Sequence, residues 1–289
     1  MNPLRPRRSA LYVPGSNARA LAKAGTLPAD VLILDLEDAV APGAKEEARR
    51  AAVEAIRRGL GRAEVVLRVN ALDTPWGAAD LAAAAGSGAD AVLLPKVEGA
   101  DAVREAGRRL DAEGAPASMS LWAMVETPRG VLHAEAVASS SPRLACLVAG
   151  TSDLTRDLRA RHTPGRSEVL TSLSLLVLAA RASGLAALDG VHLDLDDEAG
   201  FVAACRQGRD LGFDGKTLIH PRTVLAANLE FTPGDGELAL AGRIIEAHAA
   251  AQAAGQGVVV VDGRLVEGLH VAEARRLLAL AAAIEARSG

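Results

Sequence analysis

Short apolar runs alternate with Ala-, Arg- and Glu-rich stretches along most of this 289-residue chain. Such alternation is typical of βα units, in which helices connect the strands of a parallel sheet. The runs are almost continuously apolar, which predicts strands buried on both faces. We therefore predict an α/β fold, a (β/α)8 TIM barrel over residues 1–231, rather than an open doubly wound sheet. The predicted strands begin near Leu11, Val31, Val65, Ala91, Leu121, Leu144, Leu185 and Phe213.

The last part of the chain departs from this alternation. "TPGDGE" at 232–237 precedes an Ala-rich stretch that predicts a helix, and "VVVVDGRLVEG" predicts a hairpin with Asp262 and Gly263 in its turn. A terminal helix is expected from about His270. Residues 232–289 are too few to bury a core of their own, so we expect this helix–hairpin–helix to pack on its own barrel or on a neighbouring copy as a lid.

Composition and charge exclude several classes of function. The formal net charge is −4 with acidic and basic residues interspersed, so the chain lacks the basic surface that nucleic-acid binding requires. No apolar stretch is long enough to span a membrane, and the basic start at Arg5 to Arg8 lacks the apolar run of a signal peptide. We expect a cytoplasmic protein with no membrane partner. Cys146 and Cys205 have no metal-type spacing and are expected to be reduced core thiols.

Polar residues follow nearly every predicted strand. In a barrel, the C-terminal ends of the strands converge on one mouth, where active sites are built. A single polar residue after a strand can simply start a loop, whereas the complete set predicts a functional mouth. The residues at the predicted strand ends are Pro14, Gly15, Asp35, Glu37, Asp38, Arg68, Asn70, Lys96, Glu98, Glu126, Thr151, Asp153, His192, Asp194, His220 and Pro221.

Two of these carboxylates predict a metal site. Glu126 ends the apolar run "LWAMVE", and Asp153 follows the next strand, so the two side chains can meet at the mouth. An ionised group at the edge of a core is costly unless something compensates its charge. Mg²⁺ commonly takes one or two protein carboxylates and completes its shell with substrate oxygens and water. The alternative is that each carboxylate caps the helix behind it, because "TSD" at 151–153 has the composition of an N-cap.

Basic residues near the strand ends suggest anion binding. Arg68 is flanked by apolar residues in "LRVN", and a buried guanidinium needs a carboxylate or an oxyanion opposite. It can form a structural ion pair with Glu37 or Asp38, bind substrate, or do both. Lys96 and Glu98 can form a structural pair at the rim.

Two further basic residues lie near the start of the chain. Arg19 and Lys23 lie four residues apart after the first strand, where they can hold a polyphosphate or simply form a solvated helix face. His220 stands apart from the other histidines because "IHP" closes the last strand at the mouth.

Taken together, these motifs resemble one family. "LYVPGSNARALAKA", "LDLEDAVAPGAKEEAR", "LRVNALDTPWG", "LLPKVE", "MVETPRG", "GTSDL", "DDEAGF" and "GFDGKTLIHP" occur in order from about Leu11 onward. They resemble the citrate lyase beta-subunit-like acyl-CoA lyases, which include malyl-CoA and citramalyl-CoA lyases, within the HpcH/HpaI aldolase superfamily.

The resemblance implies roles for particular residues. It implies a Mg²⁺ site, which Mn²⁺ can also occupy, at Glu126 and Asp153, and a substrate-binding Arg68 with Glu37 and Asp38 in the same mouth. Coenzyme A, as part of the substrate, would contact Arg19 and Lys23 and the segment Ile219, His220 and Pro221.

The resemblance also implies a homotrimer or hexamer in which the C-terminal appendage of one subunit covers the site of the next. In related lyases this appendage brings an acid/base aspartate, but here the corresponding position holds Glu267. His192 in "DGVHLDL" is a second departure from the family pattern, and it bears on the choice of acceptor.

The function expected from this resemblance is Mg²⁺-dependent cleavage of a 3-hydroxyacyl-CoA to acetyl- or propionyl-CoA and a 2-oxo acid. Malyl-CoA, methylmalyl-CoA and citramalyl-CoA are the candidate substrates. Arg68 would stabilise the developing negative charge, and Glu267 would protonate the departing carbanion. The alternatives are a malyl-CoA thioesterase and a citrate lyase beta subunit that acts on a citryl-acyl carrier protein. A non-catalytic binding protein on this fold is a more distant alternative.

Overall fold

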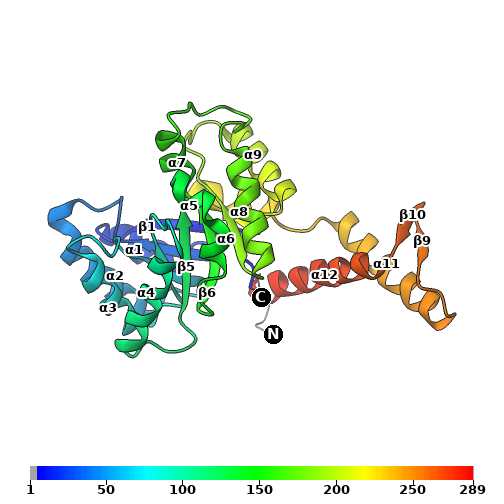
Figure 1. Ribbon diagram of the computed structural model, residues 1–289, viewed down its shortest axis with the longest axis horizontal. Helices are drawn as coiled ribbons and strands as arrows, with labels where there is room; N and C mark the ends of the chain where they lie inside the picture. Colours follow the sequence, from blue (N-terminus) through cyan, green and yellow to red (C-terminus); the bar gives the residue numbers. More distant parts are fainter. Residues whose placement is uncertain (1–4, 289) are drawn as a thin grey trace. The chain divides into compact units, whose positions relative to one another are not determined.

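The computed structural model describes residues 5–288 and contains a closed barrel of eight parallel strands (Figure 1). Each strand pairs with the next along the chain, and the eighth pairs with the first, which closes the barrel. The prediction of a (β/α)8 TIM-barrel fold is confirmed. The strands are β1 (Ser9–Pro14), β2 (Val31–Asp35), β3 (Glu64–Arg68), β4 (Ala91–Leu94), β5 (Ser120–Val125), β6 (Leu144–Ala149), β7 (Ala186–Asp189) and β8 (Gly215–Leu218).

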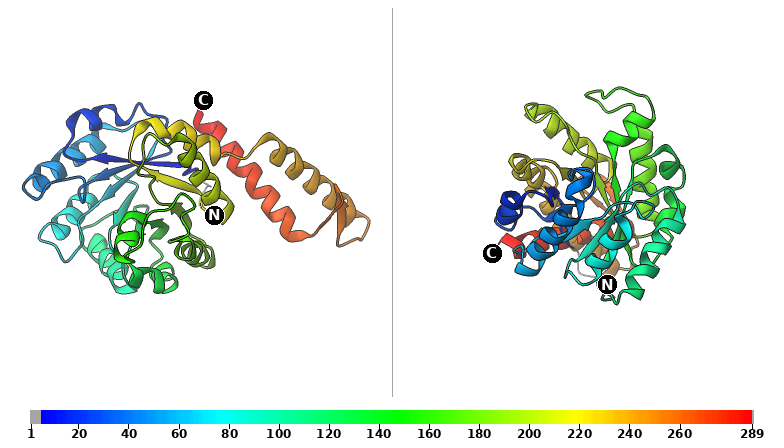
Figure 2. Two further views of the ribbon diagram at one scale, coloured as in Figure 1. Left: turned by 90° about the horizontal axis from the view of Figure 1, so that it is seen from above. Right: turned by 90° about the vertical axis from the view of Figure 1, so that its left-hand side faces the viewer.

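Helices connect the strands and lie outside them (Figure 2). Glycine residues end several of these helices; Gly212, for example, adopts a left-handed φ of 100° after α9. The helices of this unit are α1 (Ala18–Ala24), α2 (Lys45–Arg58), α3 (Gly77–Ala85), α4 (Ala100–Ala112), α5 (Pro128–Leu132), α6 (Ala134–Ala138), α7 (Thr151–Asp157), α8 (Leu170–Ala182), α9 (Glu198–Leu211) and α10 (Val224–Glu230), with short 3-10 turns η1 (Pro42–Ala44) and η2 (Pro221–Thr223).

Side chains of the strands form two hydrophobic cores. One core fills the barrel interior and includes Ile33, Val66 and Trp122, while the larger one lies between the strands and the helices. Successive residues of a strand point to opposite faces, so the residue two places beyond an interior residue also faces inward. Asp35, two places after Ile33, and Arg68, two places after Val66, therefore face the inside of the barrel at its C-terminal end.

The seventh strand is shorter than the sequence predicts. β7 ends at Asp189, and the next residues form a loop before α9, so His192 and Asp194 lie beyond the strand. The Asp189 carboxylate explains this end. It accepts hydrogen bonds from Lys216 Nζ at 2.8 Å and from Arg166 Nη1 at 2.7 Å, and its Oδ1 accepts one from the Gly190 backbone N–H. These bonds hold the end of β7 at Asp189, which is paired with Lys216 in the register of β7 and β8.

The barrel, Arg7–Phe231, forms one compact unit, and the chain from Thr232 onward belongs to a second unit. The second unit consists of α11 (Asp235–Ala253), the two-stranded antiparallel sheet β9 (Val259–Val261) and β10 (Arg264–Val266), and α12 (Gly268–Ser288). Asp262 and Gly263 form the hairpin turn with φ of 48° and 76°, the left-handed backbone that this kind of turn needs.

The core of the second unit is small. Its buried members are Val261, Val266 and Val271, with partly buried residues of α11 packed against them. Val260 and Leu265 are 64% and 55% exposed, so each hairpin strand also presents an apolar side chain to the outside. In the part of the chain that the structure describes, no helix is both long and apolar enough to cross a membrane.

Candidate active site

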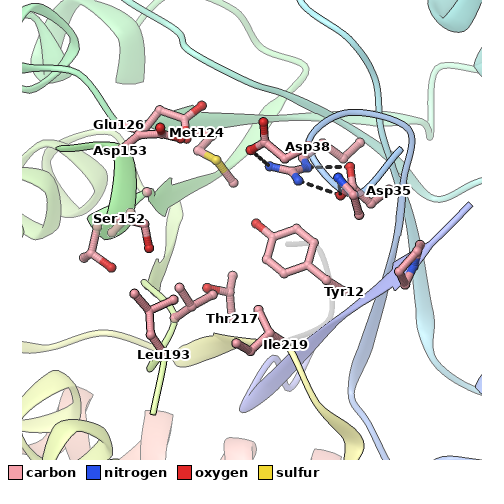
Figure 3. Close-up of a pocket in the computed structure, with 17 residues that line it drawn as sticks. Tyr12, Asp35, Asp38, Met124, Glu126, Ser152, Asp153, Leu193, Thr217 and Ile219 are labelled. Carbon is pink, nitrogen blue, oxygen red and sulfur yellow. Dashed lines mark hydrogen bonds and ion pairs between the residues drawn. The ribbon is translucent and has the colours of Figure 1, made fainter. Parts of the chain in front are cut away.

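A cavity of about 370 Å³ opens at the C-terminal ends of the barrel strands (Figure 3). Acidic and basic side chains occupy one side of it, and apolar side chains from the later strands occupy the other. The predicted mouth is therefore a pocket within the barrel unit itself. It is lined by Tyr12, Pro14, Asp35, Asp38, Ala39, Arg68, Met124, Glu126, Ala149, Gly150, Thr151, Ser152, Asp153, Val191, Leu193, Thr217 and Ile219.

Glu126 and Asp153 lie together at the edge of this pocket, after the neighbouring strands β5 and β6 (Figure 3). Glu126 is only 2% exposed, and its Oε1 accepts a hydrogen bond from the Lys96 backbone N–H at 2.7 Å. Burial raises the pKa of Glu126 to about 8, and the neighbouring Asp153 carboxyl group also raises it. Without a cation, the buried pair therefore disfavours its fully ionised state.

Gly150 allows this close approach. A Cβ built on Gly150 would lie 2.2 Å from the Cβ of Glu126 and 2.7 Å from its Oε2, distances that atoms cannot adopt. Only glycine lets the end of β6 pass this close to the carboxylate. The first turn of α7, which carries Asp153, is brought beside Glu126 in this way.

The capping alternative for the two carboxylates is wrong. The N-cap of α5 is Thr127, whose Oγ1 accepts from the Gly130 N–H at 3.0 Å, so Glu126 does not cap that helix. The N-cap of α7 is Gly150, without a side-chain cap, and Asp153 lies in the first turn. Both carboxylates are thus available for another role.

The donor set fits a hard divalent cation. Among residues 5–288 there is no group of three or more acidic, histidine or cysteine side chains arranged to hold a metal. Two carboxylates still suit Mg²⁺, which leaves its other positions to water and substrate oxygens. Asp153 Oδ1 also lies 2.5 Å from Nη1 of Arg156, but that arginine side chain is 65% exposed, and a solvated surface pair of this kind contributes little.

Arg68 is held mainly by a residue to which the sequence analysis assigned no role. Its Nε and Nη2 donate to the two carboxylate oxygens of Asp35 at 2.7 and 2.6 Å. Asp35 and Arg68 are directly paired in the register of β2 and β3, which places the two side chains side by side. Burial lowers the pKa of Arg68, but the hydrogen bonding to Asp35 and the negative charges of neighbouring groups together outweigh it and keep the pKa well above its ordinary value.

The predicted ion pairs of Arg68 are also present. Its Nη1 lies 3.0 Å from Glu37 Oε2 and 3.4 Å from Asp38 Oδ2. Arg68 therefore faces three carboxylates, and most of its donors are used within the protein. The signal for Asp35 was in the sequence, since "LD" ends the second apolar run two residues before Glu37.

Lys96 joins this network, but the predicted pair between Lys96 and Glu98 is wrong. Lys96 Nζ instead forms a hydrogen bond and ion pair with Glu37. The Oε2 atom of Glu98 lies 3.8 Å from Nε of Arg129. Lys96 has a φ of 49°, a left-handed backbone that is uncommon for lysine. This conformation directs its N–H to Glu126 and its side chain to Glu37. The Glu37–Arg68 network is thereby coupled to the pair formed by Glu126 and Asp153.

The remaining predicted residues lie in different places. Ile219 lines the pocket, and His220 and Pro221 follow it on the exposed surface, where His220 Nδ1 accepts from the Arg222 N–H at 3.2 Å. Arg19 and Lys23 are exposed on α1, four residues apart as expected.

Two further residues complete the predicted set. Glu267 belongs to the second unit, is half-buried and precedes α12, and its backbone N–H donates to His270 Nδ1 at 3.0 Å. His192 packs edge-on against Phe201, with ring centroids 6.0 Å apart, and is not among the lining residues of the pocket.

The apolar side of the pocket contains a residue that the sequence analysis missed. Tyr12 of β1 lies beneath Arg68, whose Cζ is 4.9 Å from the centre of the tyrosine ring. Burial raises the pKa of Tyr12 well above its ordinary value. The signal available in the sequence was its place in the first strand, two residues after the interior residue Ala10, together with its being the one tyrosine of the chain.

Comparisons with known proteins show what the chain is similar to. Residues 8–221 match the family model described as HpcH/HpaI aldolase/citrate lyase. The chain is 48% identical to the (3S)-malyl-CoA thioesterase of Cereibacter sphaeroides, over 97% of this chain and 96% of that protein. It is 40% identical to the citrate lyase subunit beta of Escherichia coli, over 96% and 94% of the two chains.

A solved structure extends the likeness to the whole fold. The protein CitE from Mycobacterium tuberculosis, in complex with magnesium, acetoacetate and coenzyme A, is 32% identical and superposes with a TM-score of 0.78. The match covers 96% of this chain and 100% of that one.

Proposed function

Because this chain belongs to the HpcH/HpaI aldolase/citrate lyase family, we propose that it is a magnesium-dependent enzyme that hydrolyses the thioester of a 3-hydroxyacyl-CoA such as malyl-CoA. The observation that carries this choice is the level of identity to named relatives. Four malyl-CoA thioesterases are 47–48% identical to the chain, whereas the citrate lyase beta subunits are 35–40% identical. The sequence motifs favour carbon–carbon cleavage, whereas the higher identity to the thioesterases favours the thioesterase alternative.

The metal site of this proposal is the pair Glu126 and Asp153. Magnesium bound there would neutralise the two carboxylates and polarise oxygens of the acyl group. Lys96 holds Glu126 through its backbone N–H, and Gly150 leaves room for the carboxylate. These contacts keep Glu126 oriented toward the pocket before substrate arrives.

Arg68, Glu37 and Asp38 form the opposite side of the proposed site. Since Arg68 is already bound to Asp35 and Glu37, its proposed role is a fixed positive charge facing the substrate rather than a free side chain that closes on it. Glu37 and Asp38 would orient water near the acyl group. Hydrolysis adds the oxygen of a water molecule to the thioester carbonyl carbon, breaks the C–S bond and transfers a water proton to the departing sulfur, so that the free acid and CoA result.

The coenzyme A part of the substrate is proposed to leave the pocket past Ile219. This residue belongs both to the pocket lining and to the exposed segment that continues with His220 and Pro221. β8 pairs with β1, and α1 follows β1 after a short turn, so Arg19 and Lys23 are the cations proposed for the phosphate groups.

One assay tests hydrolysis against cleavage. Purified protein with Mg²⁺ and malyl-CoA should release free CoA and malate, without acetyl-CoA or glyoxylate. Asp153→Ala should abolish this turnover while the thermal midpoint stays within a few degrees, because Asp153 lies at the pocket edge and its ion-pair partner Arg156 is exposed. Turnover by Asp153→Ala at the wild-type rate would overturn the proposed metal site.

Carbon–carbon cleavage is the second candidate, because citrate lyase beta subunits match the chain over nearly its whole length. It would release acetyl-CoA with glyoxylate from malyl-CoA, or with pyruvate from citramalyl-CoA. Formation of acetyl-CoA as the main product would exclude the thioesterase in favour of this reaction. Absence of turnover with free CoA thioesters, but activity on a citryl-acyl carrier protein, would indicate a citrate lyase subunit instead.

A further inference from the structure

The hydroxyl group of Tyr12 points into the pocket without a partner. β1 directs Ala10 and then Tyr12 toward the barrel interior, and Tyr12 and the strand-end residue Pro14 both line the pocket. Figure 3 shows its hydroxyl in the open part of the pocket, between Met124 and Thr217. Within the described part of the chain, this hydroxyl takes part in no hydrogen bond.

Arg68 holds the ring of Tyr12 in place. Arg68 lies over its face with Cζ 4.9 Å from the ring centre, and Asp35 holds Arg68 with two hydrogen bonds of 2.7 and 2.6 Å. Such a cation–π contact orients the ring. The hydroxyl is therefore a preorganised group whose position does not depend on bound substrate.

Two other side-chain donors at the pocket, those of Arg68 and Thr217, are already engaged. Arg68 directs its donors to Asp35, Glu37 and Asp38, and the Thr217 hydroxyl donates to the Asp189 carbonyl oxygen at 3.1 Å. Burial raises the pKa of Tyr12, so the phenol stays protonated and acts as a donor rather than as a base.

We propose that Tyr12 is a catalytic residue whose hydroxyl donates a hydrogen bond to the thioester carbonyl oxygen of the bound substrate. This inference rests on the proposed function. When water adds to the carbonyl carbon, the π electron pair of the C=O bond moves onto this oxygen, and it returns when the C–S bond breaks. In carbon–carbon cleavage, the electron pair of the broken bond delocalises onto the same oxygen, while the hydroxyl-bearing carbon becomes a carbonyl and releases its proton. One donor at this position stabilises charge in both reactions.

The first test is the substitution Tyr12→Phe. It removes the donor but keeps the ring beneath Arg68, so folding should be unaffected. We expect kcat to fall about 100-fold, since that is the effect of losing one oxyanion donor, with KM changed by less than about threefold. Magnesium affinity, measured by calorimetry, should stay at the wild-type value. Wild-type kcat in Tyr12→Phe would overturn the proposal.

Ser9→Ala is the matched control for a lost hydroxyl. Ser9 lies on the same strand at its other end, and its hydroxyl donates to Asn228 Oδ1 at 2.7 Å. This substitution should lower the thermal midpoint and leave kcat unchanged. An equal loss of kcat in both variants would indicate that β1 acts only as a structural element, and it would overturn the proposed role of Tyr12.

A spectroscopic experiment separates this inference from the proposed function. Tyr12 is the one tyrosine in the sequence, so tyrosine labelled with carbon-13 at Cζ yields a single resonance. The probe is Mg²⁺ with a malyl-CoA analogue in which a methylene group replaces the sulfur, which keeps the carbonyl but cannot be hydrolysed. Saturating probe should shift the resonance, whereas CoA alone should not. If the resonance does not move, the proposed role of Tyr12 is overturned, even if the wild-type enzyme hydrolyses malyl-CoA. If the resonance shifts but malyl-CoA is not hydrolysed, the proposed hydrolysis is overturned, while the proposed hydrogen bond from Tyr12 to the carbonyl oxygen stands.

Discussion

Among single residues, the pocket combines buried carboxyl groups with a buried guanidinium group. Glu126 is buried beside Asp153, and within residues 5–288 no cationic side chain forms an ion pair with it; the Lys96 backbone N–H donates a hydrogen bond to its carboxylate. The carboxyl group therefore has a pKa of about 8 in place of 4.5. The charge of Arg68, in contrast, is well compensated, because three carboxylates surround its guanidinium group.

The first prediction concerns the stability of the metal-free protein. Folding raises the pKa of Glu126, so between pH 4.5 and about 8 the folded state binds more protons than the unfolded state. This contribution to stability is complete below pH 4.5 and is lost as the pH rises through about 8. With a chelator present, the thermal midpoint should fall over this range. Glu126→Gln should flatten that fall, and added Mg²⁺ should reverse it; the same slope in wild type and variant would contradict the prediction.

A second prediction follows from the pairing of Asp35 with Arg68. Asp35→Asn removes a buried charge and leaves the guanidinium with fewer compensating carboxylates, which should cost about 3 kcal/mol in the free energy of unfolding. Chemical denaturation measures this loss. Asp38→Asn is the comparison, because Asp38 is 57% exposed and only 3.4 Å from Nη1, and it should cost less than about 1 kcal/mol. Equal losses would show that the direct pairing in β2 and β3 is not what stabilises Arg68.

At the scale of elements, the ends of the strands decide which side chains meet. β5 and β6 are neighbours, and the backbone after β6 passes so close to Glu126 that a glycine is required at residue 150. β7 ends early at Asp189, which moves His192 out of the set of strand ends. The register of β2 and β3 makes Asp35, rather than Glu37, the main partner of Arg68.

The third prediction belongs to the end of β6. Gly150→Ala places a Cβ 2.2 Å from the Cβ of Glu126, so either the loop or the carboxylate must move. We expect Mg²⁺ affinity, measured by calorimetry, to fall at least about tenfold because the ligand geometry is lost. Gly86→Ala is the control, since its added Cβ meets nothing within 4 Å, and it should bind Mg²⁺ as the wild type does. Unchanged affinity in Gly150→Ala would mean that Glu126 is not a ligand.

At the scale of the whole molecule, the two units differ in how much core they possess. The barrel unit has two cores, whereas the second unit buries Val261, Val266 and Val271 and exposes Val260 and Leu265. Such a small core is insufficient for independent stability, so the second unit needs a surface to pack against. The proposed surface is a neighbouring copy of the chain, in which Glu267 would complete the site.

The fourth prediction tests this arrangement by complementation. Glu126→Ala and Glu267→Ala chains should each be inactive alone if Glu267 serves as the acid or base. Coexpressed with different tags and purified as a mixed oligomer, the two should recover part of the wild-type activity, because some sites receive both intact residues. Recovery requires an oligomer, which light scattering should detect. Inactive mixed oligomers, or a monomer with full activity, would contradict the shared site.

A variant of Glu267 tests the effect of glutamate at the position where related lyases have aspartate. Glu267→Asp shortens the side chain by one methylene group and so withdraws its carboxylate. If the longer reach serves hydrolysis, this variant should release less free CoA from malyl-CoA, and any acetyl-CoA formed would indicate a shift toward cleavage.

Much of the fold and part of the site follow from the sequence alone. Local apolar runs and turn residues determine where the strands and the hairpin form, and the order of βα units determines that their ends meet at one mouth, so Glu126, Asp153 and Arg68 can be named in advance. The partners of these residues depend on distances across the barrel that no local pattern encodes. Strand register paired Asp35 with Arg68, a left-handed backbone at Lys96 aimed its N–H at Glu126, and the interior face of β1 placed the Tyr12 hydroxyl in the pocket. Tertiary structure decided these contacts because each joins atoms from separate strands, where a shift of a single residue along one strand would turn the side chain to the opposite face.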